Sequence, residues 1–278
     1  NRYALISNWS LAWQPSRFDQ AVIETGTVVV DAAGQHAGEL KVAPDAGQTA
    51  ALDIAGGWLR VVDTVEIAAA GTDGQVNLSG GKLRASRLTK GTGGTLNFTG
   101  GVLAADVVEF DLVNNGGTIA PGDSAGLTQV LGDLTINSGV LEIELGGTVA
   151  HTGFDQVMVT GNAILAGTLD VSLIDGFALG GNDVFEILDV GGTLTGQFSG
   201  LGEGARVGNF GRDLFITYVG GDGNDVALYT TERPGDFNSD GLVDGSDFLM
   251  WQSNPLVGSL SDWEANYGQP LSGNATTV

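Results

Sequence analysis

Cysteine is absent from this chain of 278 residues, so no disulfide framework stabilises it. Basic residues are scarce: 11 Lys and Arg stand against 33 Asp and Glu, and the formal net charge is −22. Such a charge repels nucleic acid and anionic lipid and attracts divalent cations, so we expect no nucleic-acid partner. No run of 18 apolar residues occurs, so we also expect no membrane span.

Helical periodicity is almost missing before residue 240. Short alternations of apolar and polar residues recur instead, for example at residues 95–98 and 140–145, between turns rich in Gly, Asn and Asp. The chain holds 46 glycines but only 6 prolines, and its 42% hydrophobic content is enough for a sizeable core. These features predict a mostly β fold of many short strands joined by tight turns.

An internal repeat is centred on three Gly-Gly pairs, at residues 56–57, 80–81 and 100–101. Each pair follows one alternating strand and precedes another, and a repeat of roughly 20–50 residues is typical of solenoids and propellers. We therefore predict a β-solenoid (β-helix-like) stack over residues 20–125. Stacking of the repeats would form two inner ladders, one of Ile54, Leu78 and Phe98 and one of Leu59, Leu83 and Leu103.

The flanking segments differ from this repeat. Residues 126–232 have longer strands without the Gly-Gly corner, and they predict a second β module that is either more solenoid or a sandwich. Residues 1–19 contain Trp9 and Trp13, and no acidic residue precedes Asp19. This segment is either a cap over the open end of the solenoid or a strand donated to another subunit.

Residues 236–247 have the ligand spacing of a calcium loop. Calcium needs six to eight hard oxygen atoms held in a flexible ring, and the sixth position, Gly241, allows the sharp turn. Val243, between two ligand positions, is expected to point inward. Five ligands would be side chains, and the residue at the seventh loop position would contribute its backbone carbonyl. The predicted ligands are Asp236, Asn238, Asp240, Leu242 (carbonyl), Asp244 and Asp247.

Two short helices are expected after this loop. The first runs over residues 248–252 and has the ligand Asp247 in its first turn, and the second covers residues 261–267. Ser261 is a plausible N-cap of the second helix, with Glu264 completing a capping box. The helices are expected to pair through Leu249, Trp251, Trp263 and Tyr267.

The sequence Asp-Phe-Asn-Ser-Asp-Gly-Leu-Val-Asp-Gly-Ser-Asp-Phe, followed by a helix that contains Trp, resembles a type I dockerin repeat. The resemblance implies calcium-ligand roles for the acidic and amide positions of the loop, within a small EF-hand-like or dockerin-like domain over residues 233–278. A full dockerin has two calcium loops, whereas this chain has one. A cohesin-like partner is therefore implied only in part.

Other segments resemble secreted bacterial β-repeat proteins of the autotransporter-like kind that carry PEP-CTERM sorting tails. These segments are residues 8–10, 17–23, 120–124, 154–157 and 221–226. The resemblance implies an extracellular or cell-surface location in a bacterium. Residues 220–225 also resemble a repeats-in-toxin calcium nonapeptide, but only one copy is present, which favours a hairpin turn.

Four of the 11 basic residues lie within nine positions: Lys82, Arg84, Arg87 and Lys90. They form either a solvated face of the solenoid or a stripe that docks something acidic, including another copy of the protein.

The functional expectation is an extracellular structural or adhesive protein that self-assembles into fibres and is stabilised by calcium. It is not expected to be an enzyme, because the chain has two histidines, His36 and His151, and no motif of a serine hydrolase, zinc protease or phosphate loop. The alternative is a carbohydrate-active enzyme or a carbohydrate-binding β-helix with a surface polysaccharide as partner, because a glycosidase needs only two carboxylates.

Overall fold

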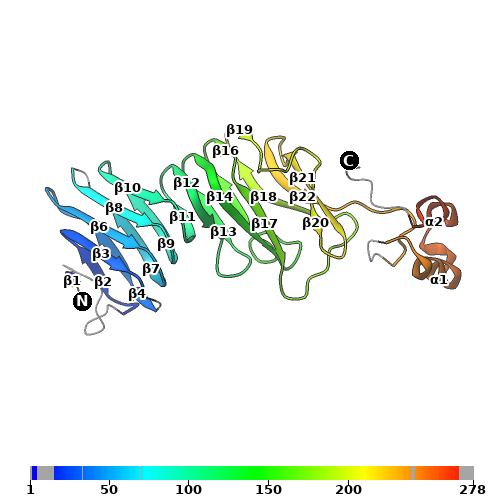
Figure 1. Cartoon of the computed structure of the whole chain (residues 1–278), viewed down its shortest axis with the longest axis horizontal. Helices are drawn as coiled ribbons and strands as arrows, with labels where there is room; N and C mark the ends of the chain where they lie inside the picture. Colours follow the sequence, from blue (N-terminus) through cyan, green and yellow to red (C-terminus); the bar gives the residue numbers. More distant parts are fainter. Residues whose placement is uncertain (1, 5–15, 33, 70, 239–241, 269–278) are drawn as a thin grey trace, which may run out of the picture.

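The protein is mostly β, with a long stack of short strands and two helices at its C-terminal end (Figure 1). The computed structural model describes residues 2–4, 16–32, 34–69, 71–238 and 242–268. The predicted β-solenoid is confirmed, because strands from successive repeats pair in parallel along the whole stack. No helix within the described ranges has the length and apolar character needed to cross a membrane.

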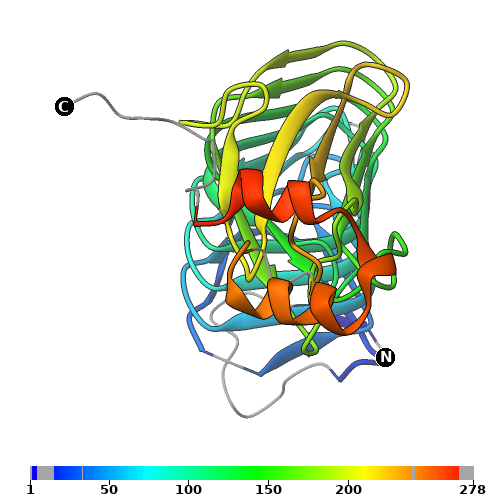
Figure 2. The ribbon, with the colours of Figure 1, turned by 90° about the vertical axis from the view of Figure 1, so that its right-hand side faces the viewer.

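Three parallel sheets form the sides of the solenoid, and each coil of the chain crosses them in turn (Figure 2). The first sheet contains, in order, β3 (Gly26–Val30), β6 (Thr49–Ile54), β8 (Asp73–Leu78), β10 (Gly94–Phe98), the first parts of β12 (Leu112–Ile119) and β14 (Leu134–Leu145), β16 (Ala163–Leu165) and β19 (Leu194–Gly196). The second sheet contains β4 (Gln35–Ala37), the first parts of β7 (Trp58–Ile67), β9 (Lys82–Lys90) and β11 (Val102–Val108), the last parts of β12 and β14, and β17 (Thr168–Leu173).

The third sheet contains β1 (Arg2–Ala4), β2 (Gln20–Ile23), β5 (Glu39–Val42), the last parts of β7, β9 and β11, and then β13 (Leu127–Val130), β15 (Gln156–Val159) and β18 (Val184–Val190). Strands β7, β9 and β11 bend from the second sheet into the third.

Both predicted inner ladders are present. Ile54, Leu78 and Phe98 lie in register on the first sheet, and all three are buried. The second sheet has a matching buried ladder in register, formed by Leu59, Leu83 and Leu103. Since burying one such side chain contributes about 1.5–3 kcal/mol, stacked apolar ladders supply much of the stability of the solenoid.

The Gly-Gly corner joins the first sheet to the second. Gly81 has a φ of 64°, and a Cβ atom there would lie 2.4 Å from the carbonyl oxygen of Gly56. A Cβ at Gly80 would lie 2.3 Å from the carbonyl oxygen of Ala55. Corners of successive coils therefore stack so closely that only glycine fits.

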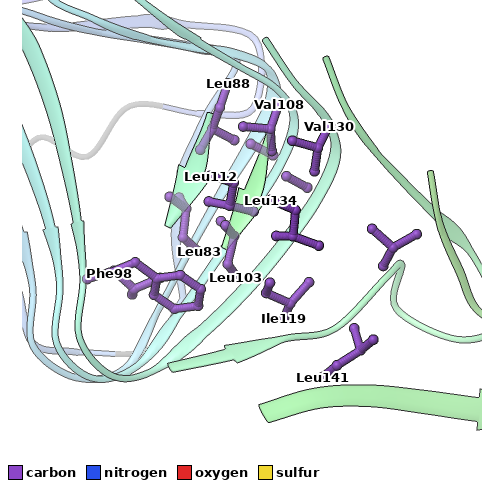
Figure 3. Close-up of a cluster of buried hydrophobic side chains, with 14 of the residues drawn as sticks. Leu83, Leu88, Phe98, Leu103, Val108, Leu112, Ile119, Val130, Leu134 and Leu141 are labelled. Atoms are coloured by element: carbon purple, nitrogen blue, oxygen red, sulfur yellow. The ribbon is translucent and has the colours of Figure 1, made fainter. Parts of the chain in front are cut away.

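The parallel stack continues without interruption past residue 125. A ladder on the third sheet crosses this point and is partly visible in Figure 3; it consists of Leu88, Val108, Val130, Val159 and Val190. The Gly-Gly corner recurs at Gly116 and Gly117, because Phe98 is in register with Asn114 and Val102 with Thr118. A buried asparagine, Asn114, takes the inner position that Phe98 has in the previous coil. Asn114 accepts hydrogen bonds from the backbone N–H groups of Gly116 (3.0 Å) and Gly117 (2.8 Å) and donates one to the Gly117 carbonyl (2.8 Å).

Antiparallel strands close the C-terminal end of the solenoid. β22 (Asp225–Tyr229) pairs antiparallel with β18 and with β21 (Asp213–Gly220), which in turn pairs with β20 (Arg206–Asn209). The turn between β21 and β22 confirms the hairpin expected at residues 220–225.

The tail contains α1 (Gly245–Ser253), the 3-10 turn η1 (Pro255–Val257) and α2 (Leu260–Asn266). The predicted N-cap of the second helix is wrong: Ser259 occupies that position without a side-chain hydrogen bond, and Ser261 lies inside the helix. The predicted role of Leu249 is also wrong, because its side chain is exposed and Phe248 packs on Trp263 instead, with ring centroids 5.0 Å apart.

Candidate functional site

The acidic loop at residues 236–247 is closed by the buried carboxylate of Asp247, in the first turn of α1. One oxygen of this carboxylate accepts the backbone N–H of Asn238 at 3.1 Å, and the other accepts that of Asp244 at 2.9 Å. Three of the predicted ligand positions are thus held in one hydrogen-bonded ring. Each oxygen of Asp247 keeps a second lone pair for another donor or for a cation.

Asp244 joins the loop to both helices. Its side chain caps α1 by accepting the N–H of Ser246 at 2.7 Å, and its carbonyl accepts the indole N–H of Trp263 in α2 at 2.6 Å. Val243 is buried, as predicted, and its carbonyl accepts the N–H of Gly268 at 3.0 Å. The loop and the two helices therefore form one packed unit.

Asp236, the first predicted ligand, is ion-paired with the closing strands of the solenoid. Its Oδ2 lies 3.2 Å from Nη2 of Arg212, and the two side chains are only 1% and 5% exposed. Arg212 also donates from Nη1 to the Thr231 carbonyl at 3.3 Å. A cavity of about 630 Å³ lies between this end of the solenoid and the tail, and Arg212 and Asp236 both line it. No pattern in the sequence links these two residues.

The chemistry of the loop fits calcium, since its side chains supply hard oxygens and Asp247 already closes the ring. Within the described ranges, however, no three acidic or histidine side chains converge on one point. Asp240, the central ligand, lies outside the described residues. The calcium site therefore stays a prediction, with Asp236, Asn238, Asp244 and Asp247 as its described side-chain ligands.

The four clustered basic residues do not share one face. Lys82 and Arg84 lie on the second sheet, whereas Arg87 and Lys90 follow the bend of β9 and lie on the third. Arg87 pairs with Glu109, and Nζ of Lys90 lies 4.8 Å from the ring centroid of Phe110. The stripe expected from the sequence is thus split in two.

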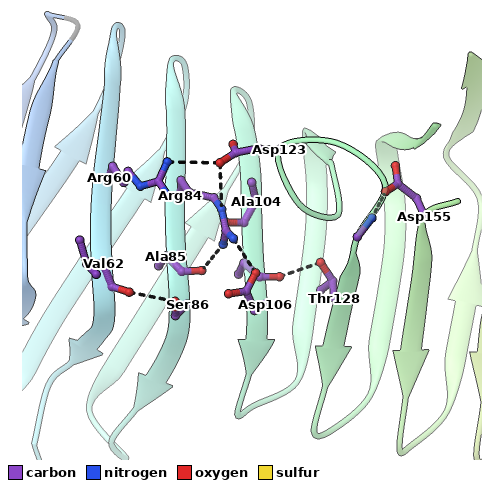
Figure 4. A network of polar contacts seen from close by, with 12 residues as sticks. Arg60, Val62, Arg84, Ala85, Ser86, Ala104, Asp106, Asp123, Thr128 and Asp155 are labelled. Carbon is purple, nitrogen blue, oxygen red and sulfur yellow. Dashed lines mark hydrogen bonds and ion pairs between the residues drawn. The ribbon is translucent and has the colours of Figure 1, made fainter. Parts of the chain in front are cut away.

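Lys82 and Arg84 instead gather with Arg60 around the carboxylate of Asp123. Figure 4 shows the two arginines beside Asp123. The distances to Asp123 are 3.3 Å from Nη1 of Arg60, 3.1 Å from Nζ of Lys82 and 3.6 Å from Nε of Arg84. Burial alone would raise the pKa of Asp123, but the hydrogen bond from Lys82 and the three positive charges outweigh it and hold the pKa below its ordinary value. We call these four residues the Asp123 cluster.

The three cations of the Asp123 cluster differ in exposure. Arg84 is 18% exposed and is fixed by Asp106 at 2.7 Å and by the carbonyls of Ala85 and Ala104 at 2.7 and 3.2 Å. Arg60 and Lys82 are 51% and 37% exposed. Arg84 therefore serves the fold, while Arg60 and Lys82 present their charges to solvent.

A cleft of about 370 Å³ lies beside the cluster, lined by Trp58, Leu59 and the four cluster residues. The Trp58 ring is held edge-to-face against His36, with centroids 4.8 Å apart. No sequence motif marks Trp58, Arg60 or Asp123 as site residues. A signal existed for the first two, because they occupy the same repeat positions as Lys82 and Arg84.

Trp9 and Trp13, predicted as partner-binding residues, lie outside the described residues. Comparisons of the chain with protein-family models, with curated proteins and with solved structures found no match, so its function has to follow from the residues described above.

Proposed function

We propose that this protein is an extracellular structural or adhesive rod rather than an enzyme, with a C-terminal tail that calcium stabilises. The observation that carries the proposal is how the outward-facing polar side chains pair with one another. Several of them pair with the same position of the next coil and form ladders along the stack. An enzyme site instead needs several such groups to converge on one cavity.

Two ladders illustrate this use. Lys41 on the third sheet bridges Glu66 at 2.8 Å and Glu39 at 3.2 Å. On the first sheet, Asn97 donates to Asn77 and Asn77 donates to Asp53, each at 2.6 Å. Cross-strand pairs of this kind contribute roughly 0.2–1 kcal/mol each, and they tie neighbouring coils together.

Calcium would have a structural role in the tail. The described part of the loop contains two buried carboxylates, Asp236 and Asp247, and Arg212 is the cation paired with the first of them. A bound divalent cation would offset the remaining negative charge and fix the loop between the two helices. Metal binding of this kind adds directly to the stability of the unit that it orders.

The ends of the rod differ, which bears on self-association. Among the pairings of the described residues, β3 and β4 at the N-terminal end and β17 and β19 at the C-terminal end have a partner strand on one side only. At the C-terminal end, β20–β22 continue the third sheet with antiparallel strands, so the two ends expose different edges. We infer that copies associate through the N-terminal edge, and that growth into fibres needs a second contact, for which the calcium-loaded tail is the candidate.

Electron microscopy and light scattering of the purified protein, with calcium and with a chelator, test this proposal. We expect calcium-dependent fibres or dimers, and deletion of residues 1–18 should leave a folded monomer. A full-length protein that stays monomeric at high concentration with calcium would refute self-association. Turnover of a polysaccharide that is lost on substitution of one carboxylate would refute the non-enzymatic assignment.

A further inference from the structure

We propose that the cleft beside Trp58 binds a carboxylated polysaccharide, with a sugar ring against Trp58 and its carboxylate between Arg60 and Lys82. This inference goes beyond the structural role proposed above. The cleft is formed by one chain, so a monomer is expected to bind whether or not copies associate.

The first argument is the placement of like charges. Arg60 and Arg84 are directly opposite in register on neighbouring strands, and Lys82 lies beside them on the same sheet. Like charges opposite each other destabilise a sheet unless an anion lies between them. The chain has only 11 basic residues, and three of them meet here. Asp123 and Asp106 balance two of these three charges, and the remaining positive charge points to an anionic ligand.

The second argument is the position of Asp123. Its carboxylate comes from the loop between β12 and β13, and in sequence it is 63 residues from Arg60 and 41 from Lys82. It occupies the point where three cations converge, so the protein itself shows that this point accepts a carboxylate. Asp123 is held there by partly exposed ion pairs, which are weak enough for a ligand carboxylate to share or displace.

The third argument is the aromatic wall. Trp58 is fixed by its edge-to-face contact with His36 and lines the cleft together with the cations. A flat aromatic ring offers an apolar surface to the C–H face of a sugar, and its indole edge offers a polar group. The cleft volume lies within the range of about 300–1,000 Å³ that is usual for small-ligand sites.

The lining also limits what the cleft does. Asp123 is its single carboxylate, whereas glycoside hydrolysis needs a pair. The cleft is therefore a binding site. An acidic protein segment would use the cations but would gain little from Trp58, which is why a uronic-acid chain fits better than a second copy of this acidic protein.

Binding of the full chain to polygalacturonate tests the proposal, with neutral dextran and polyglutamate in parallel, by calorimetry at low and high salt. We expect binding to polygalacturonate that weakens with salt, and none to dextran. The double variant Arg60→Gln with Lys82→Gln should weaken it roughly tenfold or more, as expected for losing charge-assisted hydrogen bonds. Trp58→Ala should weaken polygalacturonate binding as well.

Asp123→Asn gives the sharpest result, because it should strengthen binding several-fold by removing the competing carboxylate. Arg87→Gln and Lys90→Gln are matched controls, since they remove the same charge from the neighbouring sheet and should change nothing. Thermal unfolding of each variant separates lost binding from lost folding. The proposal is overturned if polygalacturonate does not bind, if the controls weaken binding as much as the double variant, or if polyglutamate binds equally well and Trp58→Ala has no effect.

Discussion

Gly117 is a glycine because the ring of Phe98 occupies the space of its missing side chain. A Cβ atom at Gly117 would lie 1.9 Å from Cε2 of Phe98 and 2.6 Å from Cζ, whereas carbon atoms in contact lie about 3.5–4.0 Å apart. The φ angle of Gly117 is not positive, so alanine would be excluded by this contact and not by backbone conformation. We therefore predict that Gly117→Ala is destabilising and that a smaller residue at position 98 rescues it.

The magnitude follows from the packing. Phe98 is fully buried, so its ring has to move by more than about 1 Å inside a close-packed core, and overpacking of this kind costs about 1–3 kcal/mol. Phe98→Leu alone should cost about 1–2 kcal/mol, less than the truncation of a buried Phe to Ala. In the double variant, the added methyl group fills part of the space that the ring leaves. The losses of unfolding free energy of the two single variants should therefore add up to more than the loss of the double variant. The expected difference is about 1–3 kcal/mol.

Urea unfolding followed by circular dichroism measures the four free energies of this cycle. Gly202→Ala is the control, because the nearest atom to its added Cβ is 3.9 Å away and its φ is not positive, so a change within about 0.5 kcal/mol is expected. If Gly117→Ala costs as much in the Phe98→Leu background as in the natural sequence, the ring is not what excludes the methyl group, and the packing argument is wrong.

Three further predictions concern the tail and the loops. Calcium chelation should melt residues 233–268 and leave the sheets folded, so the tertiary signal of Trp251 and Trp263 should change while the β signal stays; an unchanged tail would mean that the loop needs no metal. Arg212→Gln breaks the buried ion pair with Asp236, at a local cost of about 3–5 kcal/mol, so limited proteolysis should cut before the tail first; protection equal to that of the natural sequence would contradict this. Burial raises the pKa of Asp155 from 3.8 to about 7, so the stability linked to this group is full below about pH 4 and is lost as the pH rises toward 7. Asp155→Asn should therefore flatten the pH dependence of the unfolding free energy in this window. The same pH dependence in the variant and the natural sequence would refute this prediction.

Much of the solenoid and of the tail could be predicted from the sequence because the responsible contacts recur at regular spacing. The alternation around the Gly-Gly pairs places Ile54, Leu78 and Phe98 in one ladder, since equivalent positions of neighbouring coils must stack. The acidic loop likewise predicts α1, with Asp247 in its first turn, because the cap and the helix are adjacent in the chain. Local patterns of this kind depend on neighbours in sequence or on the next repeat.

Tertiary structure alone decided which distant residues meet. The sequence does not reveal that Asn114 takes the inner position after Phe98, so the continuation of the stack past residue 125 stayed open until the strand pairing was known. The bend of β9 separates Lys82 from Lys90, and the loop after β12 brings Asp123 to Arg60. Arg212 meets Asp236 only because the tail packs on the closing strands. These contacts depend on where coils of unequal length bend and where loops return, and no fixed spacing in the chain encodes such positions.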